Sequence, residues 1–372
     1  MNIRPFQLER YFAQYEFEVP YLLSSSDCEP LSLNELLSMA DGESMKRWNL
    51  LNLGYTESQG DPALRSEIAR LYPSVTPENI MIITPEEGIF ITLQTLLEKG
   101  DEIIVTFPGY QSLYEIATSI GCKVNYWQPK YDKAWSFETE SLKQQITSKT
   151  KLLILNFPHN PTGATLSGNQ YNEITELVKS NGITLFSDEM YRFLEHNSKD
   201  RLPSFIENYE KSIVLSGMSK SFGLAGLRIG WLITKNQSQM DQFQKLRDYI
   251  TICSSAPSEI LALMALRAKD QIIRRNLAII HQNLNVLDQF FDKYYRIFEW
   301  QRPLAGPVAF PRLLLNQNIG DFCQDLIHQK GVMLLPSSVY ELTTNHFRIG
   351  FGRKNLPEAV GQLENYVREN NF

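Results

Sequence analysis

The chain has 372 residues, 43% of them hydrophobic and 21% charged, so it is long enough to form two domains with sizeable cores. Its formal net charge of −6 disfavours a nucleic-acid-binding protein. The four cysteines and five histidines show none of the spacings of a zinc site or a disulfide framework, so we predict no metal centre.

The N-terminal segment carries Leu8, Phe12 and Tyr15 at helical spacing, which predicts a short amphipathic helix within residues 1–20. This segment lacks the apolar stretch of a signal peptide, and no later run reaches membrane-spanning length, so we expect a cytoplasmic protein. The next predicted elements are a strand at residues 21–23, a helix at 33–39 capped by Ser32, and a helix at 63–71 capped by Asp61.

From residue 80 onward, predicted strands and helices alternate. Runs such as Leu152 to Leu155 are apolar throughout, which is typical of parallel strands buried on both faces. This alternation predicts a doubly wound, mostly parallel α/β sheet. The predicted strands cover residues 80–84, 102–107, 151–155, 183–187, 212–216 and 230–234, and the helices 88–97, 110–121 and 170–180.

Beyond residue 255 the pattern changes to two helices, at 258–268 and 271–295, followed by a mixed α+β segment from residue 306. The second helix is long enough to bridge two domains. We therefore predict a large domain at 46–274 and a smaller α+β domain built from residues 1–45 and 275–372.

Ligands of open α/β sheets bind beyond the carboxyl ends of the strands, so the residues that follow each strand are the candidates for a site. The stretch from Ser216 to Gly230 places Lys220 among small residues, which allow a bulky ligand to approach the backbone. A lysine between buried strands must be neutralised, paired or used covalently. With the fixed cation of Arg228 nearby, it suits a Schiff base to pyridoxal phosphate (PLP).

Polar and aromatic residues also follow the other predicted strands. Taken singly, each has an ordinary structural explanation, such as a helix cap, a turn residue or a core aromatic, and only their joint occurrence indicates a site. They are Glu86 and Glu87 at a helix N-terminus, Tyr110 after Pro108-Gly109, Asn160 in the Asn-Pro-Thr-Gly loop, and Asp188 and Tyr191.

Together these motifs resemble the fold-type I PLP enzymes of the aminotransferase class I/II family, in the same order, over roughly residues 20–350. The resemblance implies that Lys220 forms the Schiff base and that Asp188 pairs with the protonated pyridine nitrogen. It also implies that Tyr191 and Asn160 bond the phenolic oxygen of PLP, and that Tyr110 stacks on its ring.

The resemblance further implies a phosphate site made by Arg228, by Ser219 and by the backbone N–H groups of Glu86 and Glu87. Tyr55 resembles a tyrosine that reaches the phosphate of the neighbouring subunit, which implies a homodimer with a shared active site. The phosphate loop departs from the family pattern, because it carries two carboxylates that we expect to point away from the phosphate.

An amino-acid substrate is implied by Arg348, which matches the arginine that clamps the substrate α-carboxylate in a bidentate fork. Ser25 lies in a serine run where many members of the family have a glycine that contacts this carboxylate. A purely regulatory PLP-sensing protein is disfavoured, because we see no room for a DNA-binding domain before residue 20.

The N-terminal block resembles the capreomycidine synthase-like subgroup, whose members cyclise hydroxylated arginine derivatives. That resemblance implies loss of a hydroxyl and ring closure by a guanidine, whose cation would need a carboxylate. We expect Glu9 to be that carboxylate, with Glu16, Asp27 and Glu29 as other candidates. The alternative is ordinary transamination to a 2-oxo acid, since motifs do not fix chemistry within a fold.

Overall fold

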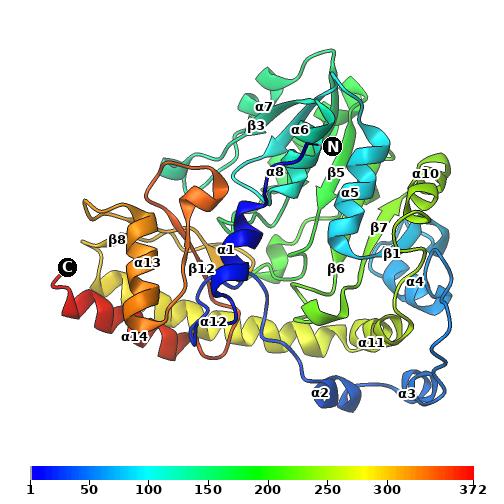
Figure 1. The fold of residues 1–372 in the computed structure, drawn as a ribbon. Helices are drawn as coiled ribbons and strands as arrows, with labels where there is room; N and C mark the ends of the chain where they lie inside the picture. Colours follow the sequence, from blue (N-terminus) through cyan, green and yellow to red (C-terminus); the bar gives the residue numbers. More distant parts are fainter. Residues whose placement is uncertain (1) are drawn as a thin grey trace.

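The computed structural model describes residues 2–372, and its centre is a seven-stranded sheet with the order β1-β7-β6-β5-β4-β2-β3 (Figure 1). All neighbouring strands pair in parallel except β7, which is antiparallel to both β1 and β6. The predicted doubly wound, mostly parallel sheet is confirmed. The strands are β1 (Ile80–Ile83), β2 (Glu102–Thr106), β3 (Lys123–Trp127), β4 (Thr150–Asn156), β5 (Thr184–Asp188), β6 (Ser212–Gly217) and β7 (Gly230–Thr234).

The apolar run of β4 is buried on both faces of the sheet. Leu152 and Ile154 belong to one hydrophobic cluster, whereas Leu153 and Leu155 belong to another on the opposite side. Alternate side chains of a strand point to opposite faces, so a strand covered on both sides must be apolar throughout. The helices in this part are α5 (Pro85–Leu96), α6 (Ser112–Ile120), α7 (Thr139–Gln145), α8 (Gly168–Asn181), α9 (Phe205–Asn208), α10 (Gln237–Arg247) and α11 (Ala256–Arg267).

The long helix α12 (Lys269–Lys293) runs from beneath the large sheet into the C-terminal part (Figure 1). There it packs in a separate hydrophobic core with the last helices and short strands. This arrangement agrees with a second, smaller α+β unit, although its predicted boundaries stay a proposal. Its elements are β8 (Phe298–Glu299), β9 (Val308–Ala309), β10 (Arg312–Leu313), α13 (Ile319–Lys330), β11 (Leu335–Pro336), β12 (Phe347–Gly350) and α14 (Leu356–Glu369).

The N-terminal helix α1 (Gln7–Tyr15) lies between the two parts (Figure 1) and is tied to both. Just before it, the Arg4 guanidinium forms ion pairs with Glu115 of α6 and with Glu341 of the C-terminal part. Within the helix, the Tyr11 hydroxyl donates to the carbonyl of Leu334 at 3.3 Å. Helix α1 therefore occupies a fixed place over the junction.

Three further helices, α2 (Leu33–Ser38), α3 (Gly42–Asn49) and α4 (Pro62–Ala69), connect α1 to the sheet. The predicted caps are confirmed, because Ser32 completes a capping box and the Asp61 carboxylate accepts from two N–H groups of α4. The strand predicted at residues 21–23 is wrong, since this segment makes only a single bridge, from Tyr21 to Val332.

Residues 24–29 are squeezed between the last strand of the small sheet and the loop that follows β6. A Cβ atom at Gly350 would overlap the carbonyl of Ser25, and one at Gly352 would overlap the carbonyl of Asp27. On the other side, a Cβ atom at Gly223 would lie 2.6 Å from the carbonyl oxygen of Glu29. Glycine is therefore required at all three positions, and it lets the backbones approach closely enough to hold this segment in place.

Among residues 2–372, no helix combines the length and the apolar composition that crossing a bilayer demands.

Candidate active site

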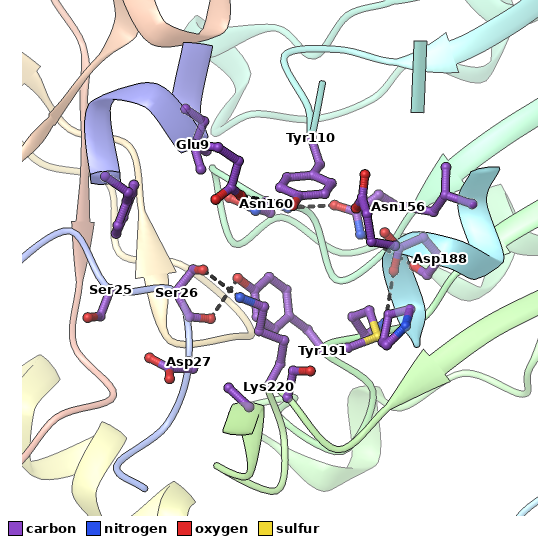
Figure 2. Close-up of a pocket in the computed structure, with 18 of the residues that line it drawn as sticks. Glu9, Ser25, Ser26, Asp27, Tyr110, Asn156, Asn160, Asp188, Tyr191 and Lys220 are labelled. Carbon is purple, nitrogen blue, oxygen red and sulfur yellow. Dashed lines mark hydrogen bonds between the residues drawn. The ribbon is translucent and has the colours of Figure 1, made fainter. Parts of the chain in front are cut away.

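A cavity of about 400 Å³ lies at the carboxyl ends of the sheet strands, where the large sheet, the small sheet and α1 meet (Figure 2). The predicted site residues line this cavity, with the exceptions of Glu87 and Tyr55. Those in the lining are Glu9, Ser25, Glu86, Tyr110, Asn160, Asp188, Tyr191, Ser219, Lys220, Arg228 and Arg348. The fold thus brings together residues that are more than 300 positions apart in the sequence.

Asp188 ends β5 as a buried carboxylate that has no ion-pair partner among the described residues. Its Oδ1 accepts a hydrogen bond from the backbone N–H of Met190 at 3.1 Å. Burial is the main cause that raises the pKa of Asp188, to about 6, despite the opposing effects of this hydrogen bond and of Lys220. Such a carboxyl group favours a partner that carries a proton.

Lys220 lies in the loop after β6, and its Nζ donates to the Oγ of Ser26 at 2.8 Å (Figure 2). Burial lowers the pKa of Lys220, and the positive charge of Arg348 acts in the same direction, whereas Asp27 opposes both. The Tyr191 hydroxyl donates to the backbone carbonyl of Ser26 at 2.8 Å. Ser26 is therefore fixed beside the amine by both its side chain and its backbone.

Arg348 on β12 is a buried cation, 1% exposed, without a carboxylate partner in the described chain. Its Nε and Nη2 donate to the carbonyl of Ser24 at 3.2 and 2.7 Å, and its Nη1 donates to the Tyr340 hydroxyl at 2.8 Å. A weaker contact of 3.3 Å joins Nη1 to Oδ1 of Asn160. An uncompensated buried guanidinium calls for an anion, and a carboxylate matches its fork.

The N-terminus of α5 offers an anion site at another end of the cavity. The helix begins with Pro85, its N-cap Thr84 makes no side-chain cap, and the first N–H groups, those of Glu86 and Glu87, have no partner in the helix. Arg228 lines the cavity as an exposed cation in a left-handed backbone conformation, with φ of 54°. A phosphate group would meet both positive elements here.

The two carboxylates of this helix terminus behave differently. The Glu87 carboxylate accepts from the Thr251 hydroxyl at 2.6 Å and lies outside the cavity lining, as the phosphate site requires. The Glu86 side chain lines the cavity, which corrects the expectation that both would point away. Burial raises the pKa of Glu86 to about 7, so its charge is largely removed below neutral pH.

Acidic side chains gather where α1 covers the cavity. Glu9 accepts a hydrogen bond from the Tyr110 hydroxyl at 3.0 Å (Figure 2), and Glu16, about two turns later at the C-cap of α1, lines the same wall. Burial, followed by the charges of Glu9 and Asp27, raises the pKa of Glu16. Asp27 is neutralised by a bidentate pair with Arg353, at 2.9 Å to each oxygen, whereas neither glutamate forms an ion pair in residues 2–372.

The chemistry of this donor set fits PLP. Asp188 supplies the unpaired buried carboxylate that a protonated pyridine nitrogen needs, and Lys220 supplies an amine whose pKa burial lowers. The α5 terminus and Arg228 suit the phosphate. The aromatic ring of Tyr110 lines the same cavity. The individual residue roles remain predictions.

Sequence reasoning missed three residues of the site. Ser26 contacts Lys220, and nothing in the run of three serines indicated such a contact; the predicted role of Ser25 at the substrate carboxylate stays a prediction. The Tyr340 hydroxyl accepts a hydrogen bond from Arg348, and the Phe12 ring lies under the Arg348 guanidinium, with 5.7 Å between Cζ and the ring centroid. The helical spacing of Phe12 indicated only a buried face, and Tyr340 follows no predicted strand.

Comparison with known proteins agrees with this geometry. Residues 45–363 match the family of class I and II aminotransferases. Capreomycidine synthase of Streptomyces vinaceus is 27% identical over 92% of this chain and 88% of its own length. A PLP-dependent aminotransferase from Streptococcus suis superimposes with a TM-score of 0.92 at 30% identity, covering 99% of both chains. The PLP-dependent cyclase OrfR superimposes with a TM-score of 0.90 at 25% identity, over 100% of this chain and 98% of that one.

The raised pKa of Asp188 leads to a test on protein from which PLP has been removed. Between about pH 4, the value for an unfolded aspartate, and about pH 6, the folded state retains a proton that the unfolded state releases. Asp188 therefore lowers the free energy of unfolding as the pH rises through this window. Asp188→Asn should raise the free energy of unfolding of the PLP-free protein by about 2–3 kcal/mol at pH 8, because it removes the buried charge. The same change should weaken PLP binding.

Urea unfolding of both PLP-free proteins at pH 4 and pH 8, with a fluorescence titration of PLP, measures the two effects. A variant less stable than the wild type at pH 8 would contradict the assignment of a destabilising buried charge at Asp188.

Proposed function

Because the chain belongs to the class I and II aminotransferases, a family of PLP-dependent enzymes, we propose that it cyclises a hydroxylated, guanidine-bearing L-α-amino acid. The reaction would begin with removal of the Cα proton. A hydroxyl group would then leave from the side chain as water, and the guanidine would add to the resulting unsaturated carbon.

PLP, when bound, supplies an electron-withdrawing ring that stabilises negative charge at the substrate Cα. The chain's own groups then have separate tasks. Asp188 would keep the ring nitrogen protonated, Arg348 would hold the substrate carboxylate, and Lys220 would take the proton from Cα. The lowered pKa of Lys220 suits it as a base, because a larger fraction of the amine is neutral.

The observation that carries the choice of substrate is the charge of the wall formed by α1. Glu9 and Glu16 face the cavity without an ion-pair partner in the described chain. Arg353 also lines the cavity, but its guanidinium is already paired with Asp27. A guanidinium would pair with these carboxylates through charge-assisted hydrogen bonds. A second carboxylate on the substrate would be repelled.

The similarity to capreomycidine synthase and to the cyclase OrfR supports the same choice. Identities of 27% and 25% are consistent with a shared scaffold and leave the reaction itself as a proposal. The alternative is an ordinary aminotransferase, which the Streptococcus suis relative favours. The two reactions share their first step and differ in where the proton and electrons go next.

We also propose a homodimer, on the basis of one exposed apolar face. Two segments form it, residues 50–55 and 249–252, and hydrogen bonds from Thr56 to Ser254 and from Arg247 to Ser58 hold them together. Exposed large apolar side chains on neighbouring segments are typical of an interface. Its exposed side chains include Leu50, Leu53, Tyr55, Tyr249, Ile250 and Ile252.

The reaction can be tested with arginine, 3-hydroxyarginine and 4-hydroxyarginine as substrates of the PLP-loaded enzyme. We expect one hydroxyarginine to give a product lighter by one water, detected by mass spectrometry, because its hydroxyl is the leaving group. Arginine, which has no leaving group, should give no such product. Fast turnover of common amino acids with 2-oxoglutarate, or accumulation of pyridoxamine phosphate, would overturn the cyclase in favour of transamination.

Glu9→Gln and Glu16→Gln test the acidic wall. Each should raise KM for the hydroxyarginine substrate by about 10- to 100-fold, the cost of one charge-assisted hydrogen bond. Glu18→Gln is the matched control, because Glu18 follows α1 but is exposed and outside the cavity lining. Steady-state kinetics on the three variants decides, and an unchanged KM in both test variants would remove these residues from substrate recognition.

Tyr55→Phe tests the shared active site. Tyr55 is 90% exposed in one chain, and it should contact the phosphate only in the dimer. We expect a dimer by sedimentation velocity and about a fivefold rise in the Kd of PLP, from the loss of one hydrogen bond. Tyr295→Phe, also exposed but on the C-terminal part, is the control. A monomer at micromolar concentration, or equal Kd values, would contradict the proposal.

A further inference from the structure

Removal of a hydroxyl group from the substrate needs a proton donor at the leaving oxygen, since hydroxide is a poor leaving group. We infer that Ser26 is this donor and that it relays to the leaving oxygen the proton that Lys220 has taken from Cα. This inference rests on the proposed cyclisation, and it names a residue that sequence reasoning did not single out.

The hydrogen bond between Lys220 and Ser26 runs in the direction that a proton relay needs. Lys220 Nζ is the donor and Ser26 Oγ the acceptor, at 2.8 Å. The O–H of Ser26 itself donates to no acceptor among residues 2–372, and Ser26 lines the cavity. The serine proton is therefore free to be given to a group in the cavity while a proton on Nζ replaces it.

The tyrosine hydroxyl groups around the cavity already donate to other acceptors, and the remaining lining serines, Ser25 and Ser219, form no hydrogen bond with Lys220. Tyr191 donates to the carbonyl of Ser26 at 2.8 Å, and Tyr110 donates to Glu9 at 3.0 Å. Tyr340 lies behind Arg348 and contacts Asn160 at 3.4 Å. Ser26 is the hydroxyl that Lys220 reaches, so a proton arriving on Nζ has this oxygen as its hydrogen-bond neighbour.

The backbone holds Ser26 in this position with little freedom. Its carbonyl is bonded by Tyr191, and the neighbouring carbonyls of Ser25 and Asp27 lie against Gly350 and Gly352, where a side chain would overlap them. The side chain of Asp27 is clamped by Arg353. A group that must meet a leaving oxygen gains from such preorganisation, because no reordering is needed during the reaction.

The step balances without a further reactant. For a hydroxyl on Cβ, the Cα–H bond breaks and its proton passes to Lys220 Nζ; the Cβ–O bond of the substrate breaks as the Cα–Cβ double bond forms. Ser26 gives its hydroxyl proton to the departing oxygen, which leaves as water, and Lys220 returns a proton to Ser26 Oγ. Both side chains end in their starting protonation states, and nothing is oxidised or reduced.

The test separates proton removal from loss of the hydroxyl group. With arginine in D₂O, the PLP-loaded enzyme should exchange the Cα hydrogen, which NMR follows and which requires Lys220 but no proton donor for a leaving group. With the hydroxyarginine that is the substrate, mass spectrometry follows the release of water. Ser26→Ala should lower water release about 100-fold, the typical contribution of a general acid, and should leave Cα exchange largely intact.

Ser26→Thr, which keeps a hydroxyl group, should restore most of the water release. Ser26→Gly, which removes the side chain altogether, should behave like Ser26→Ala and replaces it if the alanine variant does not fold. An equal loss of exchange and water release in Ser26→Ala would show that Ser26 only positions Lys220, and undiminished water release would show no role; either overturns the relay.

The two proposals can fail separately. If the wild type exchanges the Cα hydrogen but releases no water from either hydroxyarginine, the proposed cyclisation is wrong, and the relay is wrong with it. If the wild type releases water and the alanine variant does so at the same rate, the cyclisation stands and only the relay is wrong.

Discussion

Two buried charges without counter-ions inside the described chain decide what this cavity accepts. Asp188 and Arg348 both line it, 5% and 1% exposed, and neither forms an ion pair in residues 2–372. Isolated buried charges are costly, so a fold that keeps both is compensated by a ligand that brings one protonated nitrogen and one carboxylate. PLP joined to an amino acid carries both groups, and the charges of both residues act on Lys220 in the same cavity.

The acidic wall, formed by Glu9 and Glu16, favours a substrate whose side chain is positively charged. The residues predicted to contact PLP, apart from Tyr55 and Glu87, line the cavity from within the matched region of residues 45–363, whereas Glu9 and Glu16 come from the N-terminal helix and its C-cap, outside that region. On the proposed roles, the cofactor contacts and the recognition of the substrate side chain would come from different parts of the sequence. Relatives named for different activities share this scaffold.

The large sheet was predictable from sequence because its strands are apolar on both faces and each is followed by a polar loop, as at Asp188 and Lys220. The strand Lys123–Trp127 was missed because it is an edge strand with a partly exposed, mixed pattern. Ser26 was missed for another reason: which of three consecutive serines meets Lys220 depends on how Gly350 and Gly352 seat that segment, a contact across more than 300 residues.

Helix α1 and its C-cap residue supply four of the cavity-lining side chains, Leu8, Glu9, Phe12 and Glu16, within nine residues of continuous chain. It is attached by side-chain contacts of Arg4, just before the helix, and of Tyr11 within it, and it contributes no strand to either sheet. On the proposed roles of Glu9 and Glu16, substrate preference would depend on this one short segment of chain. Grafting an N-terminal helix from a relative, while leaving the PLP-facing residues alone, is a direct route to redesigned selectivity, and natural divergence can follow the same route.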